Sequence, residues 1–396
     1  MPDSWTFTSL GRVAHVEMGQ SPPSEYVSER EGLGLPFLQG NAEFTDVHPK
    51  PGLWCRKPAK SALSGDALIS VRAPVGAINR ADQDYCIGRG LAAIRFSSVD
   101  PDFGYQALAL YAAELRMVAQ GTTFEAVGGN ELRELRFPLA PALEQRRIAE
   151  ILHTLDEAIR KTEEVIAKLQ QMKQGLLHDL LTRGIDENGE LRDPERHPEQ
   201  FKDSRLGRIP REWMTQRTSE VCRLGRGRVI SQSYLLANPG PYPVYSSQSK
   251  DEGLFGSIDT FDFEGPHVTW TTDGAYAGTV FYRNGRFNCT NVCGTLQAKD
   301  EGLDMQYLAL ALAPATSRYV SRVGNDKLMN NVMGEICVPL PGFQEQSRIV
   351  RCLSSQHQRI AEEERTLSKL RTLKHGLMDD LLTGRVRVSV PEEAAA

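Results

Sequence analysis

The sequence predicts an α+β protein: two mixed α/β domains joined by two long helices that pair as an antiparallel coiled coil with pseudo-two-fold symmetry. Three observations support this prediction. Residues 143–182 recur without a gap as residues 344–383, each position shifted by 201. Both copies carry apolar residues at a seven-residue period. The stretches outside the two copies consist of short apolar runs separated by Gly, Pro and Asn, which is typical of strands and turns.

The repeated stretch has the spacing of a coiled-coil helix. Steps of four and three residues from Ile148 meet apolar residues at eight of ten positions, and the same steps from Ile349 meet them at seven of ten. Neither copy contains proline, and 40 helical residues extend about 60 Å. A helix of that length with one apolar stripe needs a partner, and the nearest partner is the other copy.

Antiparallel pairing of the two helices agrees best with the order of the chain. The second helix would then return to the first domain. A parallel pairing would require the connector of about 20 residues to span a whole helix when fully extended. The predicted parts are a first domain, a first helix, a connector, a second domain, a second helix and a tail, in the order 1–142, 143–183, 184–204, 205–341, 342–384 and 385–396.

The two predicted domains share an order of strands. Runs starting at Leu35 and Gly65 in the first domain correspond to runs starting at Tyr242 and Gly265 in the second. The connector is polar and charged, so we expect it to be an exposed crossing without a fold of its own.

Composition places the chain in a reducing compartment. Its seven cysteines are odd in number and scattered, which is typical of free thiols. The sequence shows no secretion signal and no apolar run of about 18 residues, so a cytoplasmic protein is expected. The net charge of −5 argues against a dedicated DNA-binding domain, which is commonly strongly basic.

Known catalytic motifs are absent from the sequence. It contains no phosphate-binding loop, no nucleophile elbow and no H-E-x-x-H, and the segment from Asn238 to Tyr242 imitates an adenine-methyltransferase motif poorly. Cys289 and Cys293 lack a second Cys/His pair at zinc spacing, so no metal site is expected. We therefore expect a chain without catalytic activity of its own and without a bound cofactor.

Several motifs in order give the chain a resemblance to a known family. These are PLAPALEQRRIAEIL from Pro138, LLHDLLTRGI from Leu176, FKDSRLGRIPREW from Phe201 and PLPGFQEQSRI from Pro339. Together they resemble the specificity (S) subunit of Type I restriction–modification systems. The resemblance implies two target recognition domains that each read one half of a split site in double-stranded DNA, with the two helices as a ruler between them.

The same resemblance implies partner subunits. Two methyltransferase (M) subunits would methylate adenine with S-adenosylmethionine, and two restriction (R) subunits driven by ATP would join them. S-adenosylmethionine, ATP and Mg are accordingly expected on the partners. Two alternatives stay open: the specificity subunit of a related system whose methylase and nuclease are fused in one chain, and a coiled-coil adaptor that binds no DNA.

Basic and amide side chains in loops are the candidate DNA contacts. Arginine pairs bidentately with guanine, amides pair with adenine, and basic groups contact phosphates. An exposed turn, or an internal ion pair for an arginine, is the alternative interpretation at every position. In the second domain the candidates are Arg223, Arg226, Arg228, Tyr245, Ser247, Gln248 and Lys250. In the first domain they are Gln20, Ser21, Gln39, Asn41 and Arg72.

Two glycines repeat inside the predicted helices. Gly175 and Gly376 each cost roughly 1 kcal/mol relative to alanine in a helix. Close approach of a neighbouring subunit would account for both, which makes these positions candidate contacts of the M subunits.

Overall fold

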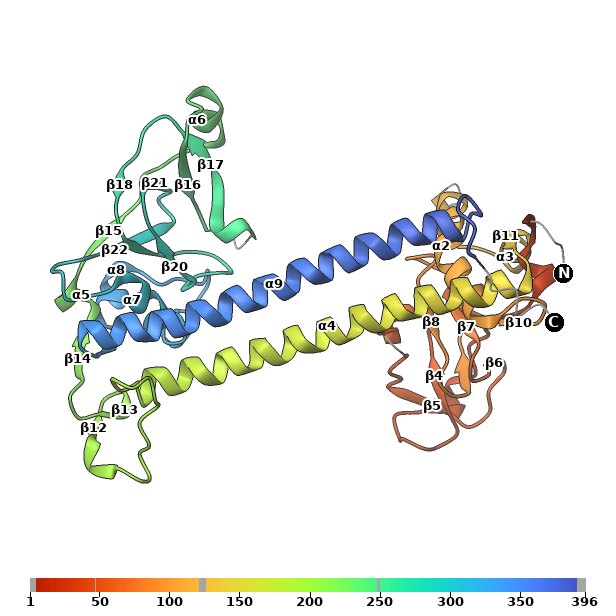
Figure 1. Ribbon diagram of the computed structural model, residues 1–396, viewed down its shortest axis with the longest axis horizontal. Helices are drawn as coiled ribbons and strands as arrows, with labels where there is room; N and C mark the ends of the chain where they lie inside the picture. Colours follow the sequence, from red (N-terminus) through yellow and green to blue (C-terminus); the bar gives the residue numbers. More distant parts are fainter. Residues whose placement is uncertain (1–4, 47, 121–125, 248–249, 390–396) are drawn as a thin grey trace. The chain divides into compact units, whose positions relative to one another are not determined.

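The computed structural model describes residues 5–389 except 47, 121–125 and 248–249, and it leaves the side chains of 118–120 and 250 undescribed. The chain divides into two compact units. Unit 1 comprises residues 1–164 and 364–396, and unit 2 comprises 165–363. Each long helix therefore contributes one half to each unit (Figure 1).

Unit 1 contains a four-stranded antiparallel sheet in the order β2-β10-β7-β8 and a five-stranded sheet in the order β3-β5-β4-β9-β6. A separate pair joins β1 (Thr6–Ser9) to β11 (Arg136–Leu139). The strands of the first sheet are β2 (Ala14–Met18), β10 (Leu91–Phe96), β7 (Ala67–Ser70) and β8 (Ile78–Arg80). Those of the second are β3 (Val27–Ser28), β5 (Leu53–Cys55), β4 (Leu35–Leu38), β9 (Tyr85–Ile87) and β6 (Ser61–Ala62).

Three helices complete the globular part of unit 1: α1 (Leu10–Val13), α2 (Pro101–Gln120) and α3 (Gly129–Glu134). The apolar face of α2 packs into the main core, where Phe103 and Leu108 are fully buried. The helix begins at Pro101, where the Asp100 carboxylate accepts the amide N–H groups of Asp102 and Phe103.

Unit 2 repeats the four-stranded sheet and the separate strand pair of unit 1, and its second sheet has four strands where that of unit 1 has five. Its antiparallel sheet has the order β15-β22-β19-β20, its second sheet the order β17-β16-β21-β18, and β14 (Met214–Arg217) pairs with β23 (Cys337–Leu340). The strands of the two sheets are β15 (Cys222–Arg226), β22 (Cys293–Ala298), β19 (His267–Thr271), β20 (Val280–Arg283), β17 (Leu254–Ile258), β16 (Tyr242–Tyr245), β21 (Arg286–Cys289) and β18 (Phe263–Glu264). The helices are α5 (Thr218–Val221), α6 (Gln232–Ala237), α7 (Met305–Leu312) and α8 (Asn330–Glu335).

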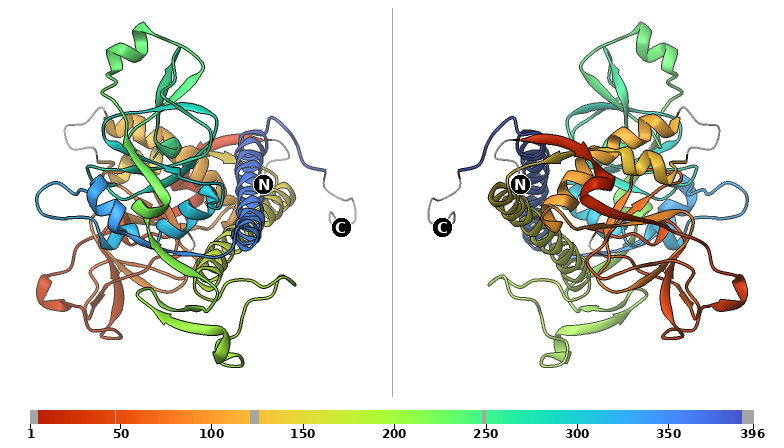
Figure 2. Two further views of the ribbon diagram at one scale, coloured as in Figure 1. Left: turned by 90° about the vertical axis from the view of Figure 1, so that its left-hand side faces the viewer. Right: turned by 90° about the vertical axis from the view of Figure 1, so that its right-hand side faces the viewer.

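The two long helices, α4 (Ala142–Thr182) and α9 (Phe343–Leu381), run in opposite directions within each unit (Figures 1 and 2). In unit 1 the Lys374 Nζ lies 2.5 Å from the Asp156 Oδ1. In unit 2 the Lys173 Nζ lies 3.2 Å from the Nδ1 of His357, which is the repeat counterpart of Asp156. Early residues of one helix thus meet late residues of the other in both units, and the predicted antiparallel pairing is confirmed.

Gln145 and Gln346, which occupy the same repeat position near the starts of α4 and α9, tie each helix to the globular part of its unit. Each side chain accepts a backbone N–H from the segment before α2 or α7 and donates to a carbonyl just before its own helix. The bonds are Asp100 N to Gln145 Oε1 at 2.7 Å, Gln145 Nε2 to Ala140 O at 2.7 Å, Asp304 N to Gln346 Oε1 at 2.8 Å and Gln346 Nε2 to Pro341 O at 2.9 Å. Four matched bonds explain why this residue recurs.

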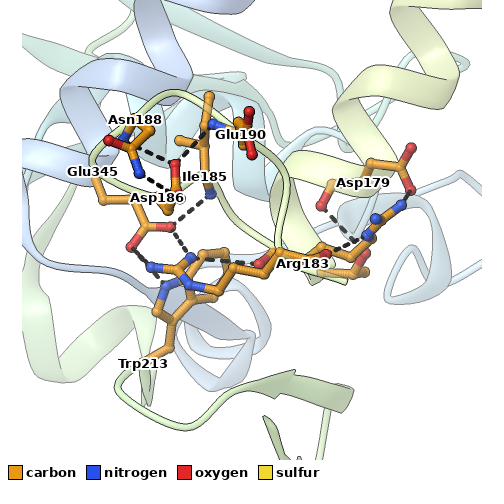
Figure 3. Close-up of polar contacts among 10 residues, drawn as sticks. Asp179, Arg183, Ile185, Asp186, Asn188, Glu190, Trp213 and Glu345 are labelled. Atoms are coloured by element: carbon orange, nitrogen blue, oxygen red, sulfur yellow. Dashed lines mark hydrogen bonds and ion pairs between the residues drawn. The ribbon is translucent and has the colours of Figure 1, made fainter. Parts of the chain in front are cut away.

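The repeated Glu near the start of each long helix, Glu144 in α4 and Glu345 in α9, binds a tryptophan and an arginine from other segments of its unit. Glu345 accepts from the Trp213 Nε1 at 3.1 Å and from the Ile185 N at 2.9 Å (Figure 3). It also pairs with both terminal nitrogens of Arg192, at 2.5 and 3.1 Å. In unit 1 Glu144 accepts from the Trp5 Nε1 at 3.0 Å and pairs with Arg387. The Arg387 guanidinium lowers the pKa of Glu144 against the opposing effect of burial.

The connector is exposed over much of its length, as predicted, at residues 187–190 and 195–200. It is nevertheless anchored: Ile185 and Phe201 are buried, and β12 (Phe201–Ser204) forms a hairpin with β13 (Gly207–Pro210). Arg192 ties it to Glu345 in an ion pair whose two side chains are 15% and 8% exposed. Two apolar anchors and one enclosed ion pair thus hold a segment that was expected to have no fold of its own.

Candidate nucleic-acid interface

In unit 1 several strand ends converge on the loop Gly88–Arg89–Gly90 between β9 and β10. We call this place the unit-1 junction. Three backbone hydrogen bonds join the segments: Gln20 N to Ile87 O at 3.0 Å, Gly88 N to Leu38 O at 2.8 Å and Val71 N to Gly90 O at 2.9 Å. Residues that follow β2, β4 and β7 are thereby brought beside one loop.

The unit-1 junction gathers most of the predicted contacts of the first domain. Gln20, Gln39 and Arg72 are exposed there. The half-buried Ser21 accepts the Arg89 N–H at 3.4 Å, and the half-buried Asn41 starts a 3-10 helix, Asn41–Glu43, just after β4. Amide, hydroxyl and guanidinium groups from separate segments therefore share one surface.

Arg89 is a residue that the sequence analysis missed. Its side chain is exposed, and it has no partner among the residues that the structure describes. A signal was present, because Gly88-Arg89-Gly90 repeats the Gly-Arg-Gly pattern of Gly225 to Gly227.

The equivalent place in unit 2, the unit-2 junction, is the loop Thr290–Asn291–Val292 between β21 and β22. It repeats the backbone bonds of unit 1: Arg228 N to Cys289 O at 3.1 Å, Thr290 N to Tyr245 O at 2.8 Å and Thr272 N to Val292 O at 2.9 Å. A glycine is required in each junction. A Cβ on Gly19 would lie 2.2 Å from the Gly88 O, and one on Gly227 would lie 2.2 Å from the Cys289 O.

Two of the predicted arginines lie at the unit-2 junction, and each has an acidic partner. Arg226 donates from Nη2 to the Asp273 Oδ2 at 3.2 Å and from Nε to the Asn291 O at 2.6 Å. Arg228 donates from Nε to the Asp262 Oδ2 at 2.8 Å. That hydrogen bond raises the pKa of Arg228, and burial opposes the rise. The sequence analysis missed both carboxylates because each lies more than 30 positions from its arginine.

The other predicted residues of the second domain have different surroundings. Arg223 is exposed near the opposite end of β15, so it does not join the junction. The Tyr245 ring lies under the guanidinium of Arg283 at 3.7 Å, and only its carbonyl takes part in the junction. Ser247 is half-buried. Gln248 and the Lys250 side chain lie outside the described residues.

The cysteines considered as metal ligands are buried. Cys289 and Cys293 flank the unit-2 loop and are nearly inaccessible, and their thiols contact each other, which with burial raises the pKa of Cys289. Within the described parts of the chain, no cluster of three or more His, Cys, Asp or Glu side chains could hold a metal ion. The same part of the chain contains no helix that is long and apolar enough to cross a membrane.

A duplicated fold with two equivalent polar junctions is thus present, and comparison with known proteins identifies its family. The model of the type I restriction modification DNA specificity domain matches residues 2–171 and 210–372. The chain belongs to the family of type I restriction modification DNA specificity domains. Both matches of this specificity-domain chain reach from a globular part into its long helix.

Related specificity subunits agree with this assignment. The chain is 38% identical over 189 residues to a putative type I restriction enzyme specificity subunit of Methanocaldococcus jannaschii, covering 47% of the chain and 44% of that protein. It is 32% identical over 223 residues to a putative type I specificity subunit of Mycoplasma pneumoniae, covering 56% and 81%. The chain thus matches less than half the length of the archaeal relative.

A solved structure shows the same fold. The S subunit of a type I restriction–modification system from M. genitalium superimposes with a TM-score of 0.62, covering 96% of both chains at 18% identity. The specificity-domain fold of two globular parts and two long helices is therefore not particular to this chain.

Proposed function

We propose that the chain is the DNA specificity subunit of a Type I restriction–modification complex and reads a bipartite, asymmetric site. The observation that carries this proposal is the pair of equivalent junctions with unlike side chains. The unit-1 junction presents Gln20, Gln39, Arg72 and Arg89, and the unit-2 junction presents Arg226 and Arg228 with their carboxylates. Two junctions with the same backbone arrangement and different side chains suit the recognition of two different base sequences.

The net charge of −5 is compatible with this function because the positive groups are local. Arg72 and Arg89 have no acidic partner among the described residues and suit phosphate contacts. The exposed amides of Gln20 and Gln39 suit bidentate pairing with adenine. The chain itself is proposed to be non-catalytic, with S-adenosylmethionine, ATP and Mg bound by partner subunits.

Exposed residues on the long helices favour the proposal that two M subunits bind the chain. Met172 of α4 and its counterpart Leu373 of α9 are 55% and 51% exposed. Gly175 lies three positions after Met172, and Gly376 lies three positions after Leu373. A Cβ on either glycine would meet no atom within 4 Å. Packing inside the chain therefore does not explain these glycines. Two copies of one apolar, close-approach surface suit two identical M subunits, and R subunits would join that assembly.

Purification of the chain with its M subunit tests both assembly and DNA binding. We expect two M subunits per chain by native mass measurement, and an affinity for DNA that falls steeply with salt. Gly175→Leu combined with Gly376→Leu should remove the M subunits, whereas Gln170→Leu, exposed on another face of α4, should not. A complex that assembles but binds no DNA at low salt would favour the protein-adaptor alternative.

A further inference from the structure

The unit-2 junction contains two arginines that are held in place by carboxylates. Resting on the function proposed above, we infer that the half-site read by unit 2 contains a guanine, contacted by the guanidinium of Arg226 or Arg228 while Asp273 and Asp262 position those side chains. The inference specifies a base in one half of the site, which the family assignment does not.

Arg226 is fixed along one edge of its guanidinium. Its Nε donates to the Asn291 O at 2.6 Å, and its Nη2 donates to the Asp273 Oδ2 at 3.2 Å and the Thr272 Oγ1 at 3.4 Å. Its Nη1 has no partner among the described residues, and the side chain is 38% exposed. One terminal nitrogen of the guanidinium, Nη1, is therefore free to meet a ligand.

Arg228 is fixed in a similar way. Its Nε donates to the Asp262 Oδ2 at 2.8 Å, and its guanidinium lies 5.3 Å from the centre of the Tyr234 ring. The Tyr234 hydroxyl is a further hydrogen-bonding neighbour of the guanidinium, and the side chain is 39% exposed. An arginine held at Nε presents two parallel N–H groups at its far end, which match the O6 and N7 acceptors of guanine.

The carboxylates favour a base over a phosphate as the ligand. Asp262 and Asp273 lie within 3.2 Å of the guanidinium nitrogens and would repel a phosphate brought to the same arginines. A neutral guanine edge avoids that repulsion. Fixing the side chain before binding also removes the loss of rotamer entropy that a free arginine pays on contact.

Guanine is also preferred over the other bases on chemical grounds. Adenine presents a donor at N6 and cytosine a donor at N4, and a donor facing the N–H groups of a fixed guanidinium forms no hydrogen bond. Thymine presents one acceptor beside a methyl group, so only one of the two N–H groups would be satisfied. A guanidinium with two N–H groups free at its far end therefore selects guanine, and Arg228 comes nearer to this geometry because the Nη2 of Arg226 already donates to two acceptors.

Methylation mapping of substituted strains tests the inference. We would map methylated adenines in cells that express the M subunit with the wild-type chain, Arg226→Lys, Arg228→Lys, Asp273→Asn, Asp262→Asn or the control Arg205→Lys. Lysine keeps the charge but loses the bidentate fork. The control changes the same residue type in unit 2, at the exposed turn between β12 and β13, which is not among the candidate DNA contacts.

At least one arginine variant should lower discrimination at one guanine of one half-site by roughly 10-fold or more, and the other half-site should keep its bases. The Asp→Asn variant of the carboxylate that holds this arginine should also lower discrimination at the same guanine. An Asp→Glu variant at that position keeps the carboxylate and should lose less discrimination than Asp→Asn. Arg205→Lys should leave the whole motif unchanged. Thermal unfolding of each complex confirms that the variants are folded.

Binding of the assembled complex to modified oligonucleotides provides a second measurement when a variant abolishes methylation. Replacing the guanine by 7-deazaguanine, which lacks the N7 acceptor, should weaken the wild-type complex and leave the arginine variant unaffected. A unit-2 half-site without guanine, or variants that keep full discrimination at every guanine, would overturn the inference. A wild-type chain that directs no split motif would instead overturn the proposed function and the inference with it.

Discussion

Glu345→Ala is expected to lower the free energy of unfolding of unit 2 by about 3–5 kcal/mol, the range for removing one partner of a buried ion pair. The substitution leaves the 15%-exposed Arg192 as an unpaired charge and also removes acceptors from the Trp213 indole and the Ile185 amide. Because these groups come from the connector, from the segment before β14 and from the start of α9, the loss should detach the connector. Urea unfolding followed by tryptophan fluorescence measures the change.

The equivalent substitution in unit 1 is a control inside the same chain. Glu144→Ala removes the same kinds of contact, with Trp5 and Arg387, but the Arg387 side chain is 49% exposed and stays hydrated when unpaired. We expect a clearly smaller loss than for Glu345→Ala. Equal losses in the two units, or a loss below about 1 kcal/mol for Glu345→Ala, would contradict the role given to burial of the pair.

Gly227→Ala is the second substitution with a large expected effect. The new Cβ would lie 2.2 Å from the Cys289 O and 2.3 Å from the Thr290 O, both of which are backbone atoms in the unit-2 junction. Relief of this clash must move the chain beside Arg226 and Arg228. We expect a destabilisation of about 1–3 kcal/mol and a loss of DNA binding by the assembled complex of roughly 10-fold or more.

Gly52→Ala is the matched control for this clash. Its Cβ would meet no atom within 4 Å, and the position is exposed, so stability and DNA binding should stay at wild-type values. Titration of labelled DNA with each complex gives the affinities. Wild-type affinity in the Gly227→Ala complex would show that the junction takes no part in DNA binding.

The sequence predicted the features that depend on local spacing. The apolar period from Ile148 and from Ile349 gave both long helices, and the internal repeat gave their pairing and the duplicated fold. The helix starts show the limit of this approach. Glu144 and Glu345 were visible as a repeat, yet their partners Arg387 and Arg192 lie beyond the ends of the opposite helices and follow no repeat spacing.

The candidate site was predicted in part for a similar reason. Residue chemistry singled out Gln20, Arg226 and Arg228, because amides and arginines in glycine-containing loops are typical of DNA contacts. The convergence of separate strand ends on one loop is a tertiary feature, so spacing could not assign Asp273 to it, and the Gly-Arg-Gly pattern was the signal available for Arg89. Arg223 is close to Arg226 in the sequence but lies near the opposite end of β15, away from the junction, and its contact with DNA stays a prediction.

Single-molecule mapping of methylated adenine, in cells carrying the cognate M subunit with and without this gene, tests the central claim most directly. We predict a methylated motif of two unlike, separated parts that is present only with the gene. Gly19→Ala and Gly227→Ala should each disturb a different part of it. Methylation that is unchanged when the gene is removed, or a gene-dependent motif that is continuous, would contradict two readers in one chain.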